Sequence, residues 1–169
     1  SIIWAEAQEA LVAALEQIGK SDRLMVLLLP TCLAEVQQPT AETSVIALDG
    51  EEQAALAAHA LFGAILSPGM IAVDIADIAP LMAGRRFRLA GSWRAESWEA
   101  ASSLLDRCEI PSGAAYLVTI TMPAHMTLSE LDSLFSQIGS RLPSSAAMLP
   151  AAPFTEGNVI AITCLVSDS

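Results

Sequence analysis

The sequence has few basic side chains, no long apolar run and no glycine cluster. Eight Lys and Arg stand against nineteen Asp and Glu, for a formal net charge of −11. Binding to a phosphate backbone needs the opposite balance, so we expect no nucleic-acid partner. The purest apolar run, residues 24–29, is far shorter than the roughly 20 residues that span a bilayer, so we expect no membrane insertion. The nine glycines are never closer than six residues. This spacing excludes a recognisable glycine-rich nucleotide loop, and we expect this chain alone to bind no cofactor.

Reactive and metal-binding side chains are also scarce. The three cysteines, Cys32, Cys108 and Cys164, form no CxxC motif. They predict reduced core thiols and a cytoplasmic location. His59 and His125 have no acidic or thiol partner at metal-ligand spacing, so we expect structural roles and no metal site.

What the sequence has in quantity is apolar side chains, which make up 53% of its 169 residues, against 16% charged residues. This balance predicts a compact chain of one domain or two small ones. The sequence begins with Ser1. We therefore expect a processed chain or a piece of a longer one.

The first half of the chain mixes helices and strands. Periodicity and turn residues predict helices at 4–18 and 51–66, strands at 24–29 and 44–48, and a loop at 31–43. The helix at 51–66 is apolar nearly all round, which predicts that it is buried.

The second half has a regular order. We expect a half-exposed strand from Arg86, a helix at 96–105, and a central strand at 115–122. A capping box formed by Thr127 and Glu130 opens the next helix. Strands follow at 145–149 and 159–166. The order β-α-β-α-β-β predicts an α/β chain of the α+β kind, with helices on one side of a mixed four-stranded sheet.

Four of the eight basic residues lie close together in the sequence, at Arg85, Arg86, Arg88 and Arg94. One interpretation is the solvated face of an edge strand, whose charges discourage pairing with another sheet. The other is a docking patch for an acidic partner, with Trp93 and Trp98 as anchors.

Two carboxylates three residues apart, Asp74 and Asp77, lie in the run from Pro68 to Ile78, PGMIAVDIADI. Asp74 can cap a helix, with Asp77 in its first turn near the positive end of the helix dipole. The alternative is a pair that orients a water molecule for attack on a phosphoanhydride.

This run resembles the synergy loop of the FtsZ family of bacterial tubulin relatives, PGLINxDFADV. Four further segments are similar to the family's motifs in the same order, over nearly the whole chain. They are residues 21–30, 83–94, 112–121 and 126–131.

The resemblance implies the second half of an FtsZ/tubulin protein. Residues 1–84 would be a partial, Rossmann-like remnant of the GTPase domain with a core helix at 51–66. Residues 85–169 would be the C-terminal domain. In the family the synergy loop supplies carboxylates to GTP held by a neighbouring subunit. By resemblance Asp74 and Asp77 are catalytic in trans. The interface implied here comprises Met70, Ala72, Asp74, Asp77, Arg85, Arg86 and Trp93.

Several family features are missing from this sequence. The loop asparagine of the family is Ala72, the core helix has no Asn-Asp pair for guanine, and the phosphate loop is absent.

We therefore keep three hypotheses. The first is a homo-oligomer or a filament subunit or partner without its own GTP site, acting in the cytoskeleton or in cell division. The second is the second half of an intact filament-forming GTPase. The third is an unrelated small α+β enzyme or ligand-binding module.

The resemblance also implies a property of the isolated chain. Half of a GTPase domain exposes apolar surface where its other half would pack. We therefore expect residues 2–66 to dimerise, swap or associate in some other way.

Overall fold

The computed structural model describes residues 2–4, 25–35 and 37–168. The helix expected at 4–18 lies outside this part of the chain, apart from Trp4. In chain order the elements are β1 (Ile2–Trp4), β2 (Met25–Pro30), α2 (Thr31–Ala34), β3 (Thr43–Leu48), α3 (Glu51–Leu66), β4 (Gly69–Ile71), α4 (Ile75–Met82), β5 (Arg86–Ala95), α5 (Trp98–Arg107), β6 (Ala115–Pro123), α6 (Leu128–Gly139), β7 (Ala147–Thr155) and β8 (Ile160–Ser167).

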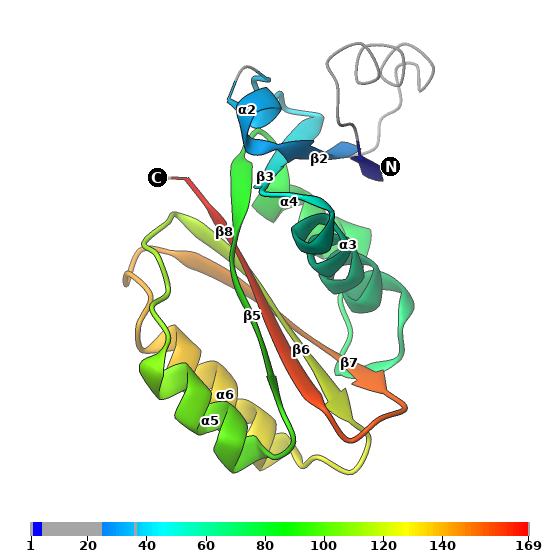
Figure 1. Ribbon diagram of the computed structural model, residues 1–169, viewed down its shortest axis with the longest axis vertical. Helices are drawn as coiled ribbons and strands as arrows, with labels where there is room; N and C mark the ends of the chain where they lie inside the picture. The colour runs from blue at the N-terminus through cyan, green and yellow to red at the C-terminus, as the bar shows by residue number, and fades with distance from the viewer. Residues whose placement is uncertain (1, 5–24, 36, 169) are drawn as a thin grey trace.

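The described strands form one mixed sheet in the order β1-β2-β3-β5-β8-β6-β7-β4 (Figure 1). β1, β2, β3 and β5 are parallel to one another, as are β6 and β7. β8 is antiparallel to both β5 and β6, and β4 is antiparallel to β7. The expected mixed four-stranded sheet is therefore confirmed as β5-β8-β6-β7. Residues Val45 to Ala47 pair with Arg86 to Arg88, so the sheet continues across the predicted domain boundary at 84/85. The division into two domains stays a prediction.

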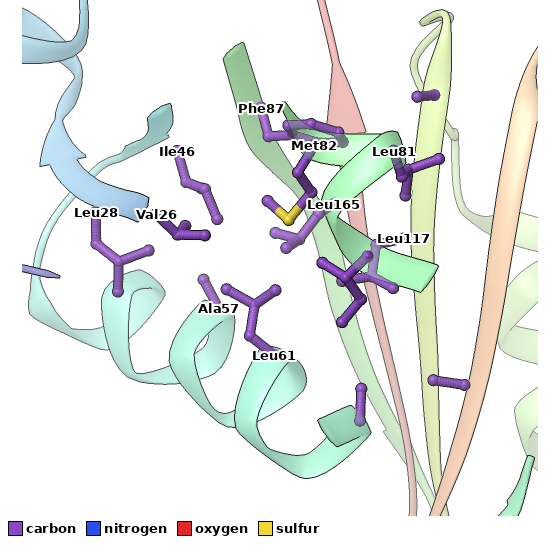
Figure 2. Close-up of a cluster of buried hydrophobic side chains, with 14 of the residues drawn as sticks. Val26, Leu28, Ile46, Ala57, Leu61, Leu81, Met82, Phe87, Leu117 and Leu165 are labelled. Carbon is purple, nitrogen blue, oxygen red and sulfur yellow. The ribbon is translucent and has the colours of Figure 1, made fainter. Parts of the chain in front are cut away.

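Helices cover both faces of the sheet. α5 and α6 pack on one face, as the sequence predicts. α3 and α4 pack on the other, around the cluster drawn in Figure 2. β6 contributes to both cores, because Leu117 faces α3 and α4 while Tyr116 and Val118 belong to the cluster of α5 and α6. This alternation explains why β6 reads as an apolar central strand.

One face of α3 is exposed, although the sequence predicts a buried helix. The buried side includes Ala57 and Leu61, which pack against the sheet. Four residues on the opposite side are exposed, and we call them the α3 stripe: Ala55, His59, Phe62 and Leu66. Apolar composition therefore overstates the burial of this helix.

The arginine-rich strand β5 is an edge strand only in its second half. Arg86 to Arg88 lie between β3 and β8, so Arg86 and Arg88 do not protect an open edge. The rest of the strand pairs with β8 alone among the described strands, so the edge-strand interpretation stands for Arg94. The alternation itself is confirmed, since Phe87 is fully buried and Arg88 is exposed. Charge pattern alone could not place the strand within the sheet.

Three short features differ from the sequence prediction. The loop at 31–43 contains the single turn α2, and β4 lies where only a helix-to-helix junction was expected. β7 runs to Thr155, well beyond 149, despite Pro150 and Pro153. Prolines fit here because the outer side of β7 meets only the three-residue β4, so few backbone donors are needed.

The expectation of core thiols holds only in part. Cys164 is buried, Cys108 is half-buried and Cys32 is exposed. None of the described helices is long and apolar enough to cross a bilayer.

Candidate functional site

The candidate site is the junction loop, residues 68–78, which follows α3 and contains β4 and the first turn of α4. α3 ends at Leu66, and β4 then pairs antiparallel with β7. The carbonyl oxygen of Pro68 accepts a hydrogen bond from the backbone N–H of Phe154, at 2.8 Å. Val73 is only 7% exposed and packs in the α3–α4 core. The loop is therefore fixed to the sheet at its start and to the core just before Asp74.

Gly69 permits the close approach of β4 to β7. A Cβ atom at this position would overlap the carbonyl oxygen of Ala152 and the backbone of Pro153. Both obstacles are backbone atoms, which cannot move aside like the end of a side chain. Gly69 at the start of the loop therefore has a packing function.

The two acidic side chains form a capping box at the start of α4. Asp74 Oδ1 accepts hydrogen bonds from the backbone N–H groups of Ala76 and Asp77, at 2.7 and 3.0 Å. Asp77 Oδ2 accepts one from the backbone N–H of Asp74, at 2.9 Å. The structural interpretation of this Asp-x-x-Asp spacing is thus confirmed.

Capping does not occupy the whole of either carboxylate. Within the described chain, Asp74 Oδ2 and Asp77 Oδ1 take part in no recorded hydrogen bond or ion pair. Both side chains are exposed, as are Ala72, Ile75 and Ala76. The junction loop therefore presents two adjacent carboxylates to the surface, where each keeps one oxygen available to a cation or a water molecule.

The other residues of the implied interface are more scattered. Arg85 lies at the far end of α4, where its Nη1 donates to the carbonyl oxygens of Leu81 and Pro80. Met70, Arg85, Arg86 and Trp93 are half-buried. The indole of Trp93 lies against Gly91.

Trp93 and Met70 belong to strands that are not neighbours. Three strands, β8, β6 and β7, separate β5 from β4 in the sheet. At about 4.8 Å per strand, the axes of β5 and β4 are about 19 Å apart. A contact that includes both side chains would have to extend across the sheet. Their interface roles stay predictions.

Sequence reasoning missed three apolar side chains around the loop. Phe62 and Leu66 precede it on α3 and are 46% and 72% exposed, and Ile75 follows Asp74 and is 52% exposed. Ile75 between Asp74 and Asp77 was the available signal, and it is a weak one because single exposed apolar side chains are common on protein surfaces.

The resolved pKa shifts concern groups outside the loop. Burial raises the pKa of the Cys164 thiol to about 12. Hydrogen bonds from the Thr127 backbone and side chain lower the pKa of Glu130. Among the described residues, no three His, Cys, Asp or Glu side chains gather as a metal site would require.

Comparison with solved structures identifies the fold. The chain matches a mutant FtsZ of M. jannaschii with a TM-score of 0.67 and 18% identity, over 90% of this chain and 57% of that chain. It matches CetZ of Methanosaeta thermophila with a TM-score of 0.64 and 10% identity, over 99% and 61%. It also matches TubZ of Bacillus thuringiensis serovar israelensis, from GDP-form protofilaments, with a TM-score of 0.54 and 9% identity, over 98% and 60%. No family model matches the sequence, and no curated protein matches it.

These likenesses show that the protein has the fold of the C-terminal half of FtsZ/tubulin-like proteins. The resemblance seen in the sequence is confirmed at the level of the fold. The chain spans about three fifths of the length of the structures that it matches.

Proposed function

We propose that this protein is a tubulin-like cytoskeletal component that contacts a neighbouring subunit through the junction loop and has no GTP site of its own. The observation that carries this proposal is the exposed pair Asp74 and Asp77 at the start of α4, in a chain with the fold of the C-terminal half of FtsZ. The TubZ relative in the comparison forms protofilaments, which supports an assembly role.

The geometry of the loop suits a contact with another molecule. Its carboxylates are held by the capping box, so little side-chain freedom is lost when they bind. Ile75 lies between them and exposes apolar surface that a partner can cover. Burial of Ile75 by a partner would stabilise such a contact, and the carboxylates beside it would supply its polar interactions.

The chemistry proposed for the carboxylates is hydrolysis of GTP held by the neighbour. Asp74 and Asp77 orient a water molecule toward the γ-phosphorus and accept its proton. The water oxygen bonds to that phosphorus as the bond to the β–γ bridging oxygen breaks, which releases GDP and phosphate. Ala72 supplies no polar side chain here, so the carboxylates act without the loop asparagine of the family.

The alternative is that the chain is the second half of an intact filament-forming GTPase. The chain matches only 57% of the length of the FtsZ structure, which favours this candidate. In both cases the junction loop meets a neighbour. The two candidates differ in whether a glycine-rich phosphate loop belongs to the same polypeptide, and the sequence of the complete gene distinguishes them.

The test mixes the purified protein with the tubulin-like GTPase of the same organism and measures phosphate release and light scattering. We expect the protein to change both signals, and Asp74→Asn to abolish most of the effect on phosphate release. Asparagine keeps the helix cap, so α4 should stay folded. The control Asp132→Asn removes the same charge from an exposed position on α6.

Two outcomes would contradict the proposal. An undiminished effect of Asp74→Asn would remove the carboxylate from the mechanism. Tight binding of a fluorescent GTP analogue to the protein alone would show that it has a nucleotide site of its own.

A further inference from the structure

Arg85 and the three arginines of β5 have no carboxylate partners in the described part of the chain. The ion pair found there joins Arg141 to Asp106, at 3.2 Å. Arg85, Arg86, Arg88 and Arg94 therefore keep their charges uncompensated at close range, although the protein has a net charge of −11. An acidic chain could readily have paired these groups internally. An acidic ligand from outside the chain could therefore pair with them.

Two of these arginines line a hollow of about 370 Å³, which we call the arginine recess. It is formed by Gln38, Pro39, Gly84, Arg85, Arg86, Ala114 and Asp168. The start of β5, the chain after α2 and the end of β8 meet at this end of the molecule (Figure 1). Arg88 is exposed two residues further along β5, on the same side of the strand as Arg86, and extends the positive surface.

The guanidinium groups of the recess are held in place but not saturated. Arg86 Nη2 donates to the carbonyl oxygen of Gln37, at 3.2 Å. Its Nε is buried and has no acceptor among the described residues. Arg85 donates through Nη1 to the carbonyl oxygens at the end of α4. Each guanidinium carries five N–H donors, so both arginines keep donors for an incoming oxyanion.

We propose that the arginine recess binds a carboxylate side chain of an acidic polypeptide segment. A planar guanidinium suits a carboxylate, because the two can form paired charge-assisted hydrogen bonds. The recess is open and has apolar walls at Pro39 and Ala114, so it can also receive the main chain that carries the carboxylate. A free phosphate would gain less, because it would meet only the guanidinium groups, whereas a peptide also contacts the apolar walls, and no glycine-rich backbone surrounds an anion here. This inference does not depend on the proposed function.

One carboxylate, Asp168, is part of the recess wall. Its backbone N–H donates to the carbonyl oxygen of Arg86, at 3.0 Å, and its side chain is within 4 Å of no described cationic nitrogen. A negative charge at this position opposes an incoming carboxylate. Removing it should strengthen binding, whereas removing an arginine should weaken it.

The experiment measures binding of a fluorescently labelled hexaglutamate peptide to the full chain by anisotropy at low salt. We expect Arg86→Gln to weaken binding about tenfold, the size expected for a lost charge-assisted hydrogen bond. Arg86→Lys, which keeps the charge but lacks the planar fork, should also weaken it. Asp168→Asn should tighten it. Arg94→Gln removes one positive charge at the far end of β5, outside the recess, and should change binding less than twofold. Circular dichroism checks that each variant is folded.

Three outcomes would overturn the proposal. If the wild type does not bind the peptide, the recess does not take an acidic polypeptide. Equal losses in Arg86→Gln and Arg94→Gln would show a diffuse charge effect without a site. Inorganic phosphate that competes as strongly as the peptide, mole for mole, would assign the recess to small oxyanions instead. A failed filament assay would leave these results unchanged, so the two proposals can fail separately.

Discussion

At the scale of single residues, Asp74 and Asp77 can stabilise a helix and serve a contact at once. The capping bonds use Asp74 Oδ1 and Asp77 Oδ2. The remaining oxygen of each side chain makes no hydrogen bond within the described chain, and both side chains are exposed, as are those of Ala72 and Ile75. The cap could be predicted from the Asp-x-x-Asp spacing because its bonds join residues two or three apart. The exposure of the pair could not, since it depends on how α4 packs against the sheet.

Gly69 provides a residue-scale prediction. Gly69→Ala should lower the free energy of unfolding by about 1–3 kcal/mol, since the new methyl group would overlap the backbone of β7 and force β4 away. Urea unfolding followed by circular dichroism measures the change.

Gly63→Ala is the matched control. A Cβ atom there lies in ordinary contact with Pro153 Cγ, at 3.7 Å, in the interior of α3. Alanine favours a helix, so this variant should be more stable by about 0.5–1 kcal/mol. Wild-type stability in Gly69→Ala would mean that β4 does not pair closely with β7.

At the scale of elements, the caps show how local signals specify helix ends. Thr127 and Glu130 form the capping box that their spacing predicts. Glu130 Oε2 accepts from the backbone N–H and from the hydroxyl group of Thr127, each at 2.7 Å. These bonds hold the pKa of Glu130 below its usual 4.5.

This shift predicts a pH dependence for the start of α6. Because the pKa is lower in the folded state, the stabilisation is complete above the unfolded-state pKa of about 4.5 and is lost as the pH falls through the folded-state value. Wild type should therefore exceed Glu130→Gln in stability at pH 7, and the difference should shrink as the pH falls below 4.5. Urea unfolding at several pH values measures it.

Glu99→Gln is the matched control, since Glu99 lies in the first turn of α5 and makes no hydrogen bond to its cap in the described chain. It removes the same charge near a helix start without removing a capping bond. A difference for Glu130→Gln that is constant from pH 7 to pH 3 would show that the capping carboxylate does not contribute.

At the scale of the whole molecule, the α3 stripe leaves apolar surface uncovered. Phe62 and Leu66 are 46% and 72% exposed on one side of a helix whose other side packs in the core. The sequence predicts association of the isolated chain, and this stripe is the described surface that best explains it.

We expect the average mass in sedimentation equilibrium to rise with protein concentration. Leu66→Ser should raise the dissociation constant about tenfold or more, because a buried leucine contributes about 1.5–3 kcal/mol. Leu128→Ser is the control, since Leu128 is 63% exposed at the start of α6. A protein that stays monomeric at millimolar concentration would contradict the expected association.

The sequence by itself determined what depends on neighbours along the chain. Helix 51–66, the capping boxes and the apolar strands follow from hydrogen bonds and periodicities that span a few residues. Only the tertiary structure decided that β3 pairs with β5, that β7 continues through Pro150 and Pro153, and that one face of α3 stays exposed. The physical reason is that alternation specifies which face of a strand is apolar but not which strand lies beside it. That choice depends on contacts between residues far apart in the chain.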